Sequence, residues 1–311
     1  MSAEPTPITW RNFHEWLRQT TRLDDELFRH AARPLGPGRL LKSILPSIAR
    51  PLFVIGAPRS GTSFVGDAIG ALPEFSYHYE PPMTKAAARC VHERLWSEAH
   101  ARRFYRFVYG WLLRRHLNGD LRFAEKTPQN CFVVRFLERA FPGAQFVHIL
   151  RDGRDAALSY REKPWLRADA KDRVRRESGG YRFGPFARFW VEPDRRAEFE
   201  STGDLHRCIW AWRRHVEAAL EQTASLPEQQ VHVLRYETLC ERPEQEGERL
   251  LDFLGIGRNS SRELLRALLL TADARSVGRW KRELEPDEEQ LIEREAGALL
   301  ARLYPDPGSA A

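Results

Sequence analysis

The residues with the clearest capacity for chemistry run from Gly56 to Ser63 and read Gly-Ala-Pro-Arg-Ser-Gly-Thr-Ser. A turn bounded by Gly56 and Gly61 exposes successive backbone N–H groups, and the helix expected after it points the positive end of its dipole to the same place. Arg59 adds a charged fork of donors. Hydroxyl donors are added by Ser60, Thr62 and Ser63. The segment therefore predicts a binding site for a phosphate or sulfate group.

This loop resembles the Walker A motif G-x-x-x-x-G-K-[ST], except that Thr62 stands at the lysine position. In kinases and ATPases that lysine reaches the β- and γ-phosphates, and the next hydroxyl group holds Mg²⁺. A ligand with one phosphate joined to a sulfuryl group needs less charge compensation and no metal. The substitution favours a phosphosulfate over ATP, and a P-loop nucleotide kinase is the alternative enzyme. A turn that uses glycine only for its geometry is the alternative without a ligand.

A second anion site is indicated where the apolar run 145–150 ends at Arg151. Ligands of open α/β sheets bind at the carboxyl ends of strands. Ser159 follows two helical turns later, on a helix face shared with residues near Asp152. Alternatively, Asp152 and Asp155 only cap the helix. Together, the two motifs match 3′-phosphoadenosine 5′-phosphosulfate (PAPS), which carries a 5′-phosphosulfate and a separate 3′-phosphate.

With these two motifs the chain resembles the PAPS-dependent sulfotransferase superfamily, and within it the bacterial branch related to tyrosylprotein and carbohydrate sulfotransferases. The resemblance spans residues 51–285 in short matching blocks. It implies that the loop Arg59, Ser60, Gly61, Thr62 and Ser63 binds the 5′-phosphosulfate, and that Arg151 and Ser159 bind the 3′-phosphate.

Two further blocks carry the same resemblance. The run 234–239 places Tyr236 near the nucleotide, although Thr238 stands where the family usually has Asp. The run 275–281 is similar to a late basic loop that closes over the nucleotide, with Arg275, Val277 and Gly278 as binding residues. In each block, the alternative is that the Tyr or Trp is simply part of the core.

The resemblance also implies catalytic groups. Glu80, followed by two prolines, lies where the related branch places its base, and His78 is the alternative base. A capping or solvated carboxylate is the alternative for Glu80 itself. Lys126 matches a recurrent E-K-T-P block and suits stabilisation of the leaving phosphate oxygen, unless it forms only a structural pair with Glu125. The expected reaction is in-line transfer, with Glu80 taking the acceptor proton and Arg59 and Lys126 neutralising the leaving phosphate, without a metal or a covalent intermediate.

The elements that must position these residues alternate between strand and helix. Strands are expected at 52–55, 121–124, 145–150 and 230–234, and helices at 62–71, 86–117, 128–141, from 152 and at 205–224. This order predicts an α/β, P-loop-type three-layer fold with a central parallel sheet flanked by helices. The expected division is a helical extension at 1–50, a sulfotransferase domain at 51–304 and a disordered tail at 305–311.

Two segments outside the motifs carry expectations about partners. The stretch 161–207, rich in Arg, Trp and Phe, is expected to form a lid or acceptor wall for a small molecule, a carbohydrate, a lipid or a peptide. Its basic and aromatic character also suits a nucleic-acid-binding protein, which would leave both anion motifs unexplained. The extension holds two expected helices, at 10–30 and 40–49; the amphipathic run 39–50 either docks on the core or lies on a membrane surface.

Composition limits the remaining classes. The 311 residues include 49 Lys and Arg against 43 Asp and Glu, a formal net charge of +6, which suits an anionic ligand without identifying it. The four cysteines stand far apart, so neither a zinc site nor a disulfide framework is expected, and a cytoplasmic location is the simplest interpretation. No signal peptide is evident, and no apolar run approaches the roughly 18 residues of a membrane-spanning helix.

Overall fold

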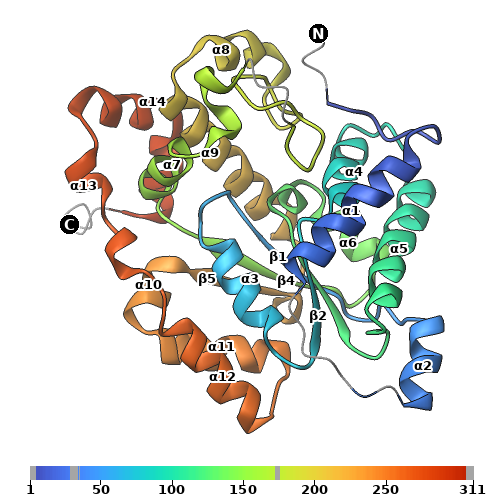
Figure 1. Cartoon of the computed structure of the whole chain (residues 1–311). Coiled ribbons are helices and arrows are strands. Elements are labelled where there is room, and N and C mark those ends of the chain that lie inside the picture. The colour runs from blue at the N-terminus through green and yellow to red at the C-terminus, as the bar shows by residue number, and fades with distance from the viewer. Residues whose placement is uncertain (1–4, 29–33, 35, 172–175, 306–311) are drawn as a thin grey trace.

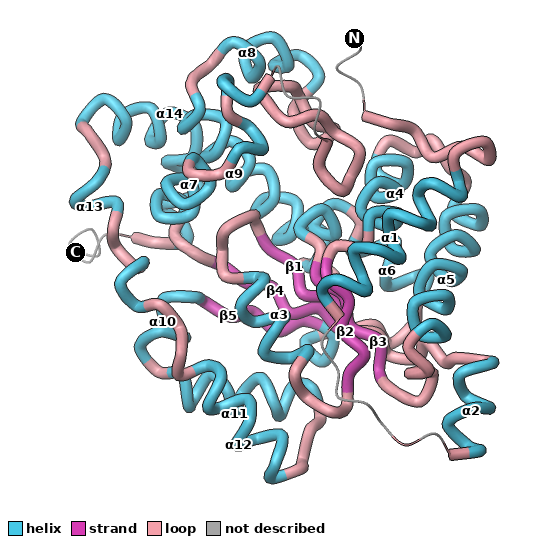
Figure 2. Tube along the Cα trace, viewed as in Figure 1, coloured by secondary structure: helices cyan, strands magenta, loops and turns pink. Residues whose placement is uncertain are grey.

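A five-stranded parallel sheet organises the protein, in the order β2-β3-β1-β4-β5. The computed structural model describes residues 5–28, 34, 36–171 and 176–305. The strands are β1 (Leu52–Gly56), β2 (Phe75–Tyr79), β3 (Arg122–Lys126), β4 (Gln145–Leu150) and β5 (Val231–Arg235). Figure 2 shows the five strands side by side in the middle of the molecule. Because all five run in the same direction, their carboxyl ends meet at one edge of the sheet. This edge is where the two anion motifs begin.

Strand β1 is buried on both faces, which explains its continuous apolar sequence. Phe53 and Ile55 pack into one hydrophobic cluster, and Leu52 and Val54 pack into another. The first cluster lies under α4 (Pro82–His92), α5 (Glu98–Arg115), α6 (Val134–Ala140), α9 (Asp204–Thr223) and α14 (Pro286–Leu303). The second lies under α3 (Thr62–Gly70), α11 (Pro243–Leu254) and α12 (Asn259–Leu269). Helices therefore cover both faces, and the predicted three-layer α/β fold is confirmed (Figure 1).

Several predicted elements need correction. The strand β2 was not predicted, because its sequence Phe-Ser-Tyr-His-Tyr mixes polar and aromatic residues as an edge strand does. The expected helix at 86–117 is two helices, α4 and α5, separated by a turn in which Arg94 has a φ of +55°. The expected helix at 128–141 is a 3₁₀ segment, Pro128–Phe132, followed by α6. The helix after the second anion motif is α7 (Gly153–Arg161).

The N-terminal extension contains two helices that lie against the domain. Helix α1 (Phe13–Leu27) packs on α4 and β2, with Trp16 buried. Helix α2 (Pro37–Ile44) lies beside the end of α5 (Figure 1). Residues 306–311 of the expected disordered tail lie outside the described residues. Within the described ranges, none of the helices combines the length and the apolar character needed to cross a bilayer.

The remaining helices frame the site from the C-terminal half of the chain. Helix α10 (Tyr236–Glu241) follows β5 directly, so that Tyr236 stands at the carboxyl edge of the sheet. Helix α13 (Trp280–Glu283) follows the late loop near α7. Helix α8 (Arg196–Ser201) precedes α9.

Candidate functional site

The loop between β1 and α3 has a backbone that its glycines make possible. Gly61 has a φ of +89°, and a Cβ atom there would lie 2.5 Å from the ring of Tyr236. A Cβ atom at Gly56, where φ is +148°, would lie 2.5 Å from the carbonyl oxygen of Ile149. Arg59 also adopts a positive φ, +68°, which is uncommon outside glycine and typical of functional turns. Glycine is therefore required at both positions, because the loop backbone passes too close to β4 at Gly56 and to Tyr236 of α10 at Gly61 for a side chain to fit.

A first cavity of about 310 Å³ opens in front of this loop. Its walls bring together both predicted anion motifs and Tyr236. The lining residues are Arg59, Gly61, Thr62, Ser63, Phe64, Arg151, Ser159, Tyr236, Asp273, Ser276 and Arg279. Seven of the sequence-predicted binding residues therefore share one cavity, although Arg59 and Arg151 are separated by 92 positions in the chain.

Arg151 is the buried centre of this first cavity. Its Nη1 donates to the carbonyl oxygen of Arg59 at 3.0 Å, and its Nη2 donates to that of Ser276 at 2.6 Å. The guanidinium lies 4.9 Å from the ring centre of Tyr236. Its Nε is buried without a hydrogen-bond partner among the described residues, as is the hydroxyl oxygen of Ser60 behind the loop. Buried donors left unpaired are costly, so the Nε of Arg151 suits a site that is completed by an anionic ligand.

Ser159 reaches the same cavity from α7. Its hydroxyl oxygen accepts a hydrogen bond from Nε of Arg59 at 3.2 Å. Asp152 caps this helix by accepting from the N–H of Arg154 at 2.9 Å, as the alternative interpretation of the motif expected. The capping role and the cavity-lining role therefore occur in the same segment, on different residues.

The late loop contributes to the first cavity, but through residues other than those predicted. Arg275 projects outward, with 94% of its side chain exposed, and pairs with Asp273. Neither Val277 nor Gly278 lines the cavity, whereas Asp273, Ser276 and Arg279 do. The prediction for Arg275, Val277 and Gly278 rested on similarity to a sequence motif. Which side chains face the cavity depends instead on the 3₁₀ turn Ala274–Ser276.

Asp155, at the start of α7, holds this loop in place. Its Oδ2 accepts from the N–H of Gly278 at 2.6 Å, and its Oδ1 accepts from the N–H of Trp280 at 2.9 Å. Burial raises the pKa of Asp155, and the two N–H groups act in the opposite direction. The carboxylate is thus a support for the loop that covers the first cavity.

A second cavity of about 290 Å³ lies next to the loop between β1 and α3, residues 56–63, which we call the oxyanion loop. It shares Arg59, Thr62 and Ser63 with the first cavity, so the loop forms a common wall. Its polar residues include Glu80, Lys126, Lys85 and Glu177, and its aromatic residues are Tyr79, Tyr160, Trp165 and Phe183. The predicted catalytic carboxylate and lysine therefore face the loop across this second space.

Glu80 is held between two lysines at the entrance to α4. Its Oε1 is in direct contact with Nζ of Lys126, and its Oε2 accepts from Nζ of Lys85 at 2.6 Å. The Lys126 ammonium also lies 3.6 Å from the ring centre of Tyr79. Burial alone would raise the pKa of Glu80, but the two lysines outweigh it and lower the pKa to about 2. The carboxylate is therefore ionised. The backbone of Glu80 has a φ of +42°, an uncommon conformation outside glycine that is often found at functional sites.

His78 does not reach either cavity. Successive side chains of a strand point to opposite faces, so His78 points away from Tyr79, which lines the second cavity. Its Nδ1 lies 2.7 Å from Oδ1 of Asp24, and its Nε2 lies 3.0 Å from Oγ of Ser76. With a fully buried ring, His78 is a structural residue that joins α1 to the sheet, which corrects its proposed role as the alternative base.

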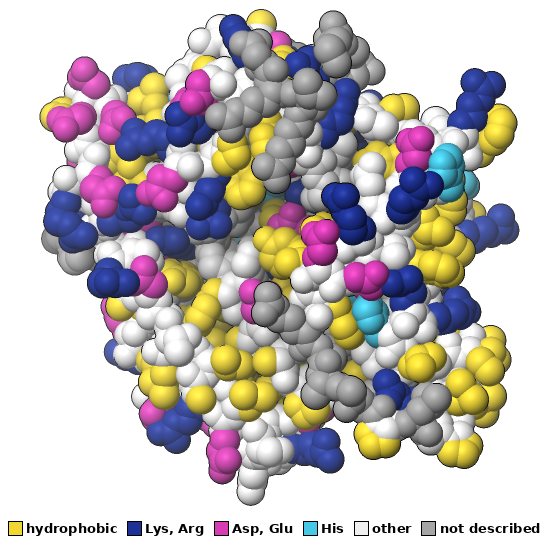
Figure 3. All heavy atoms as spheres, in the orientation of Figure 1, with side chains coloured by type: hydrophobic (Ala, Val, Ile, Leu, Met, Phe, Trp, Pro, Cys, Tyr) yellow, Lys and Arg dark blue, Asp and Glu magenta, His cyan; other side chains and the backbone are white. Residues whose placement is uncertain are grey.

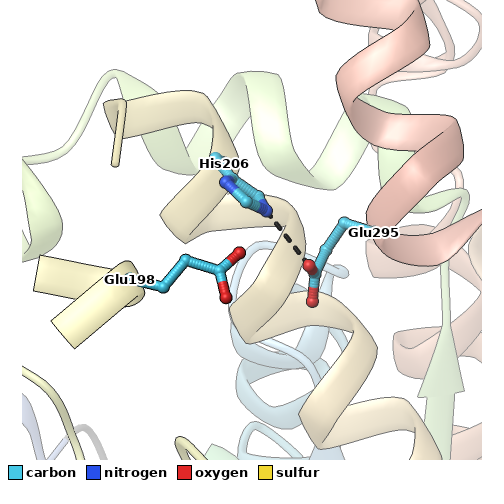
Figure 4. A group of neighbouring side chains, drawn as sticks. All are labelled: Glu198, His206 and Glu295. Carbon is cyan, nitrogen blue, oxygen red and sulfur yellow. Dashed lines mark hydrogen bonds and ion pairs between the residues drawn. The ribbon is translucent and has the colours of Figure 1, made fainter. Parts of the chain in front are cut away.

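One group of side chains outside the cavities has the composition of a metal site. Glu198, His206 and Glu295 place ligand atoms within 4.8 Å of one another (Figure 4). Arg195, however, donates to both carboxylates, at 2.8 Å to Glu198 and 2.9 Å to Glu295, and Arg213 donates to Glu295 at 2.8 Å. These arginines already balance the negative charge, so the group is explained as an ion-pair network between α8, α9 and α14.

The fold and the two cavities define a P-loop-type α/β protein whose oxyanion loop has lost the Walker lysine and faces a carboxylate–lysine pair. The chain belongs to the sulfotransferase family, whose model matches residues 51–177 and 186–259. It is accordingly a sulfotransferase enzyme, and the nucleotide-kinase alternative is set aside. No curated protein sequence is significantly similar to the chain.

Several solved sulfotransferase structures are similar to this chain, and one of them has a TM-score above 0.5. Sulfotransferase STF9 from Mycobacterium avium superposes with a TM-score of 0.52 at 12% identity, over 95% of this chain and 86% of that one. The sulfotransferase domain from the curacin biosynthetic pathway has a TM-score of 0.49 at 15% identity, over 81% and 97%. A sulfotransferase from Alicyclobacillus acidocaldarius has a TM-score of 0.44 at 19% identity, over 83% and 98%.

Proposed function

We propose that this enzyme transfers a sulfuryl group from PAPS to a hydroxyl or amine group of a small acceptor. The observation that carries the proposal is the common wall of the two cavities, formed by Arg59, Thr62 and Ser63. A group held by this wall is accessible from both sides. A donor in the first cavity would therefore present its transferable group to an acceptor in the second.

The donor set of the first cavity fits PAPS. The oxyanion loop, with its backbone N–H groups and Arg59, would hold the 5′-phosphosulfate. Arg151 and Ser159 would hold the 3′-phosphate, and the ring of Tyr236 would lie beside the nucleoside. The unpaired Nε of Arg151 is a donor that a doubly anionic ligand would satisfy, whereas Ser60 is fully buried and lines neither cavity. All these groups are cationic or hydrogen-bond donors, and the proposed transfer uses no metal.

Glu80 is the base of the proposed reaction. The acceptor oxygen forms a bond to sulfur while the bond between sulfur and the 5′-phosphate oxygen breaks, and the acceptor proton passes to Glu80. An anionic carboxylate of low pKa is a weak base toward an ordinary alcohol. It becomes effective as the new bond to sulfur makes the hydroxyl proton more acidic. Lys126 and Arg59 offset the negative charge that grows on the leaving phosphate.

The second cavity supports a small acceptor with a flat apolar face. Tyr160 and Trp165 have ring centres 5.8 Å apart on one part of the lining, and Phe183 adds a third ring. A cavity of about 290 Å³ suits one or two rings, such as a sugar or a phenol, or the end of a lipid or peptide. The reacting part of the acceptor is therefore proposed to be ring-sized and largely uncharged.

The nucleic-acid alternative loses its main support in the fold. Three aromatic residues of the 161–207 segment that would stack on bases are at most 8% exposed, and they are Tyr181, Phe189 and Trp190. Stacking on bases requires accessible ring faces. The segment is thus better explained as a packed wall of the second cavity.

Calorimetric titration with adenosine 3′,5′-bisphosphate, without metal, tests the donor site. We expect micromolar binding by the wild type, its loss in Arg151→Ala/Ser159→Ala, and no competition by ATP. The surface variant Arg249→Ala, which changes a side chain that is 65% exposed on α11, is the control and should bind like the wild type. Absence of binding by folded wild-type protein would overturn the proposal.

We further propose that α2 rests on an anionic membrane surface. The helix attaches to the domain by its polar side, where Ser43 is buried and Nε of Arg39 donates to the carbonyl oxygen of Leu117 at 2.8 Å. Its apolar side chains point outward, with Leu41 65% and Leu45 74% exposed, and apolar side chains gather over this helix (Figure 3). Lys42 on the same helix adds positive charge. The four free cysteines support a reducing compartment, as in the cytoplasm.

Co-sedimentation with phosphatidylglycerol vesicles tests this contact. We expect wild-type protein to bind and Leu41→Gln/Leu45→Gln to lose binding at least about fivefold, since apolar contact contributes along with charge. Leu264→Gln/Leu270→Gln, on α12 and directly after it, is the matched control, since these side chains are 38% and 55% exposed. Equal sedimentation of all three proteins would contradict the role of α2.

A further inference from the structure

Lys85 is a buried cation that the predicted site did not include. It lies in the first turns of α4 and is 8% exposed. Its Nζ lies 2.6 Å from Oε2 of Glu80 and 3.8 Å from Oε2 of Glu177. Burial lowers the pKa of Lys85, but the two carboxylates outweigh it and raise the pKa above its ordinary value. The side chain is therefore charged and joins two carboxylates inside the second cavity.

Glu177 is in turn fixed by the wall of that cavity. Its Oε1 accepts from Nε of Arg188 at 2.9 Å. Arg188 is 4% exposed and donates to the carbonyl oxygens of Trp165 at 3.1 Å, Arg182 at 2.9 Å and Phe186 at 2.6 Å. A guanidinium with so many fixed acceptors has little freedom to move. Glu177 therefore presents a carboxylate of fixed position to Lys85.

The result is a row of alternating charges that crosses the second cavity. Lys126, Glu80, Lys85, Glu177 and Arg188 follow one another, each in contact with the next. The row begins at the end of β3 and ends in the 161–207 segment. The two oxygens of Glu80 are thus assigned to different partners, Oε1 to Lys126 and Oε2 to Lys85. Only Lys85 connects Glu80 to the opposite wall of the cavity within this row.

We propose that Lys85 is a positioning residue for the sulfuryl transfer: anchored by Glu177, it holds Oε2 of Glu80, orients the carboxylate and keeps it ionised while Oε1 serves Lys126 and the acceptor proton. This inference rests on the proposed role of Glu80 as the base. Lys85 lines the second cavity and not the first, and its printed partners are the two carboxylates. Its action is on the geometry and charge of another residue.

The charged and titratable groups around Glu80 decide how it responds to loss of Lys85. Those lining the same cavity are Lys126, Lys85, Arg59, Arg176, Glu177, Tyr79 and Tyr160, and Tyr77 adds a further interaction from β2. Attraction by Lys126 and Lys85 is what lowers the Glu80 pKa against the effect of burial. Removing one of the two cations leaves burial less opposed, so the Glu80 carboxylate should then protonate at higher pH.

Carbon-13 NMR titration of the carboxyl groups in glutamate-labelled protein tests the inference without a known acceptor. The Glu80 signal is identified by its loss in Glu80→Gln. In the wild type the Glu80 carboxylate should stay ionised to low pH, whereas in Lys85→Met it should protonate about one to three pH units higher. Lys85→Arg should restore a titration close to that of the wild type, because the positive charge returns.

Arg89→Met is the matched control, since it removes a cation one turn further along α4 that pairs with Glu93 and does not line the second cavity. Its Glu80 titration should equal that of the wild type. If Lys85→Met does not fold, Lys85→Gln takes its place. An unchanged Glu80 titration in the Met or Gln variant overturns the inference. Absence of adenosine 3′,5′-bisphosphate binding by the folded wild type would instead overturn the proposed function. The titration would still decide whether Lys85 controls the ionisation of Glu80.

Discussion

At the scale of single residues, Thr62 stands where a Walker A loop has its lysine, and a lysine from another part of the chain lies near the loop instead. A P-loop that lacks its lysine brings less positive charge to the loop itself. Here Lys126 supplies an ammonium from the end of β3, on the side of the loop where the acceptor is proposed to bind. The cation thus lines the second cavity and is paired with the proposed base, Glu80.

Replacement of that base provides the residue-scale prediction. Glu80→Gln should lower kcat by about 10² to 10⁴, the usual contribution of a positioned general base, and should change the affinity for adenosine 3′,5′-bisphosphate little. The wild-type Glu80 pKa is depressed to about 2, so the carboxylate is ionised at every pH above that value. The rate should therefore show no acid limb near the ordinary glutamate pKa of about 4.3. Steady-state rates between pH 4 and 8 check both expectations, and a rate unaffected by Glu80→Gln would remove Glu80 from the chemistry.

At the scale of elements, residues next to a strand end were predictable and residues placed by tertiary packing were not. Arg59, Arg151 and Tyr236 each follow a parallel strand, and the strands bring them to one edge. Lys85 lies on the helix after Glu80, five positions away, where the sequence has no signal that both side chains turn into one cavity. Arg275 shows the opposite case, because its basic character suggested binding and its turn points it to solvent.

The loop that covers the first cavity provides the element-scale prediction. Asp155→Asn should weaken binding of adenosine 3′,5′-bisphosphate about tenfold, because two charge-assisted hydrogen bonds that hold the N–H groups of Gly278 and Trp280 become weaker or are lost. Calorimetry measures the change. Arg275→Ala, on the same loop, should bind within about twofold of the wild type, as its side chain is exposed. The reverse order of effects would show that the loop binds through Arg275.

At the scale of the whole molecule, a parallel sheet with helices on both faces could be anticipated from alternating apolar runs, which are strong signals in buried parallel strands. The order of the strands and the edge strand β2 could not. The position of the N-terminal helices could not either. Helix α1 is tied to the sheet through Asp24 and His78, a contact between residues 54 positions apart. Such contacts depend on the shape of the complete fold, and neither segment by itself indicates its partner.

The wall shared by the two cavities has a consequence for the order of events in turnover. Because each cavity has its own lining apart from Arg59, Thr62 and Ser63, neither substrate needs to pass through the space of the other. With donor and acceptor placed as proposed, either one can arrive first, and we expect a random sequential mechanism. The same arrangement lets a fresh acceptor enter while the spent nucleotide is still bound. That abortive ternary complex has no group to transfer, so we expect an excess of acceptor to slow the enzyme whenever release of the nucleotide limits turnover.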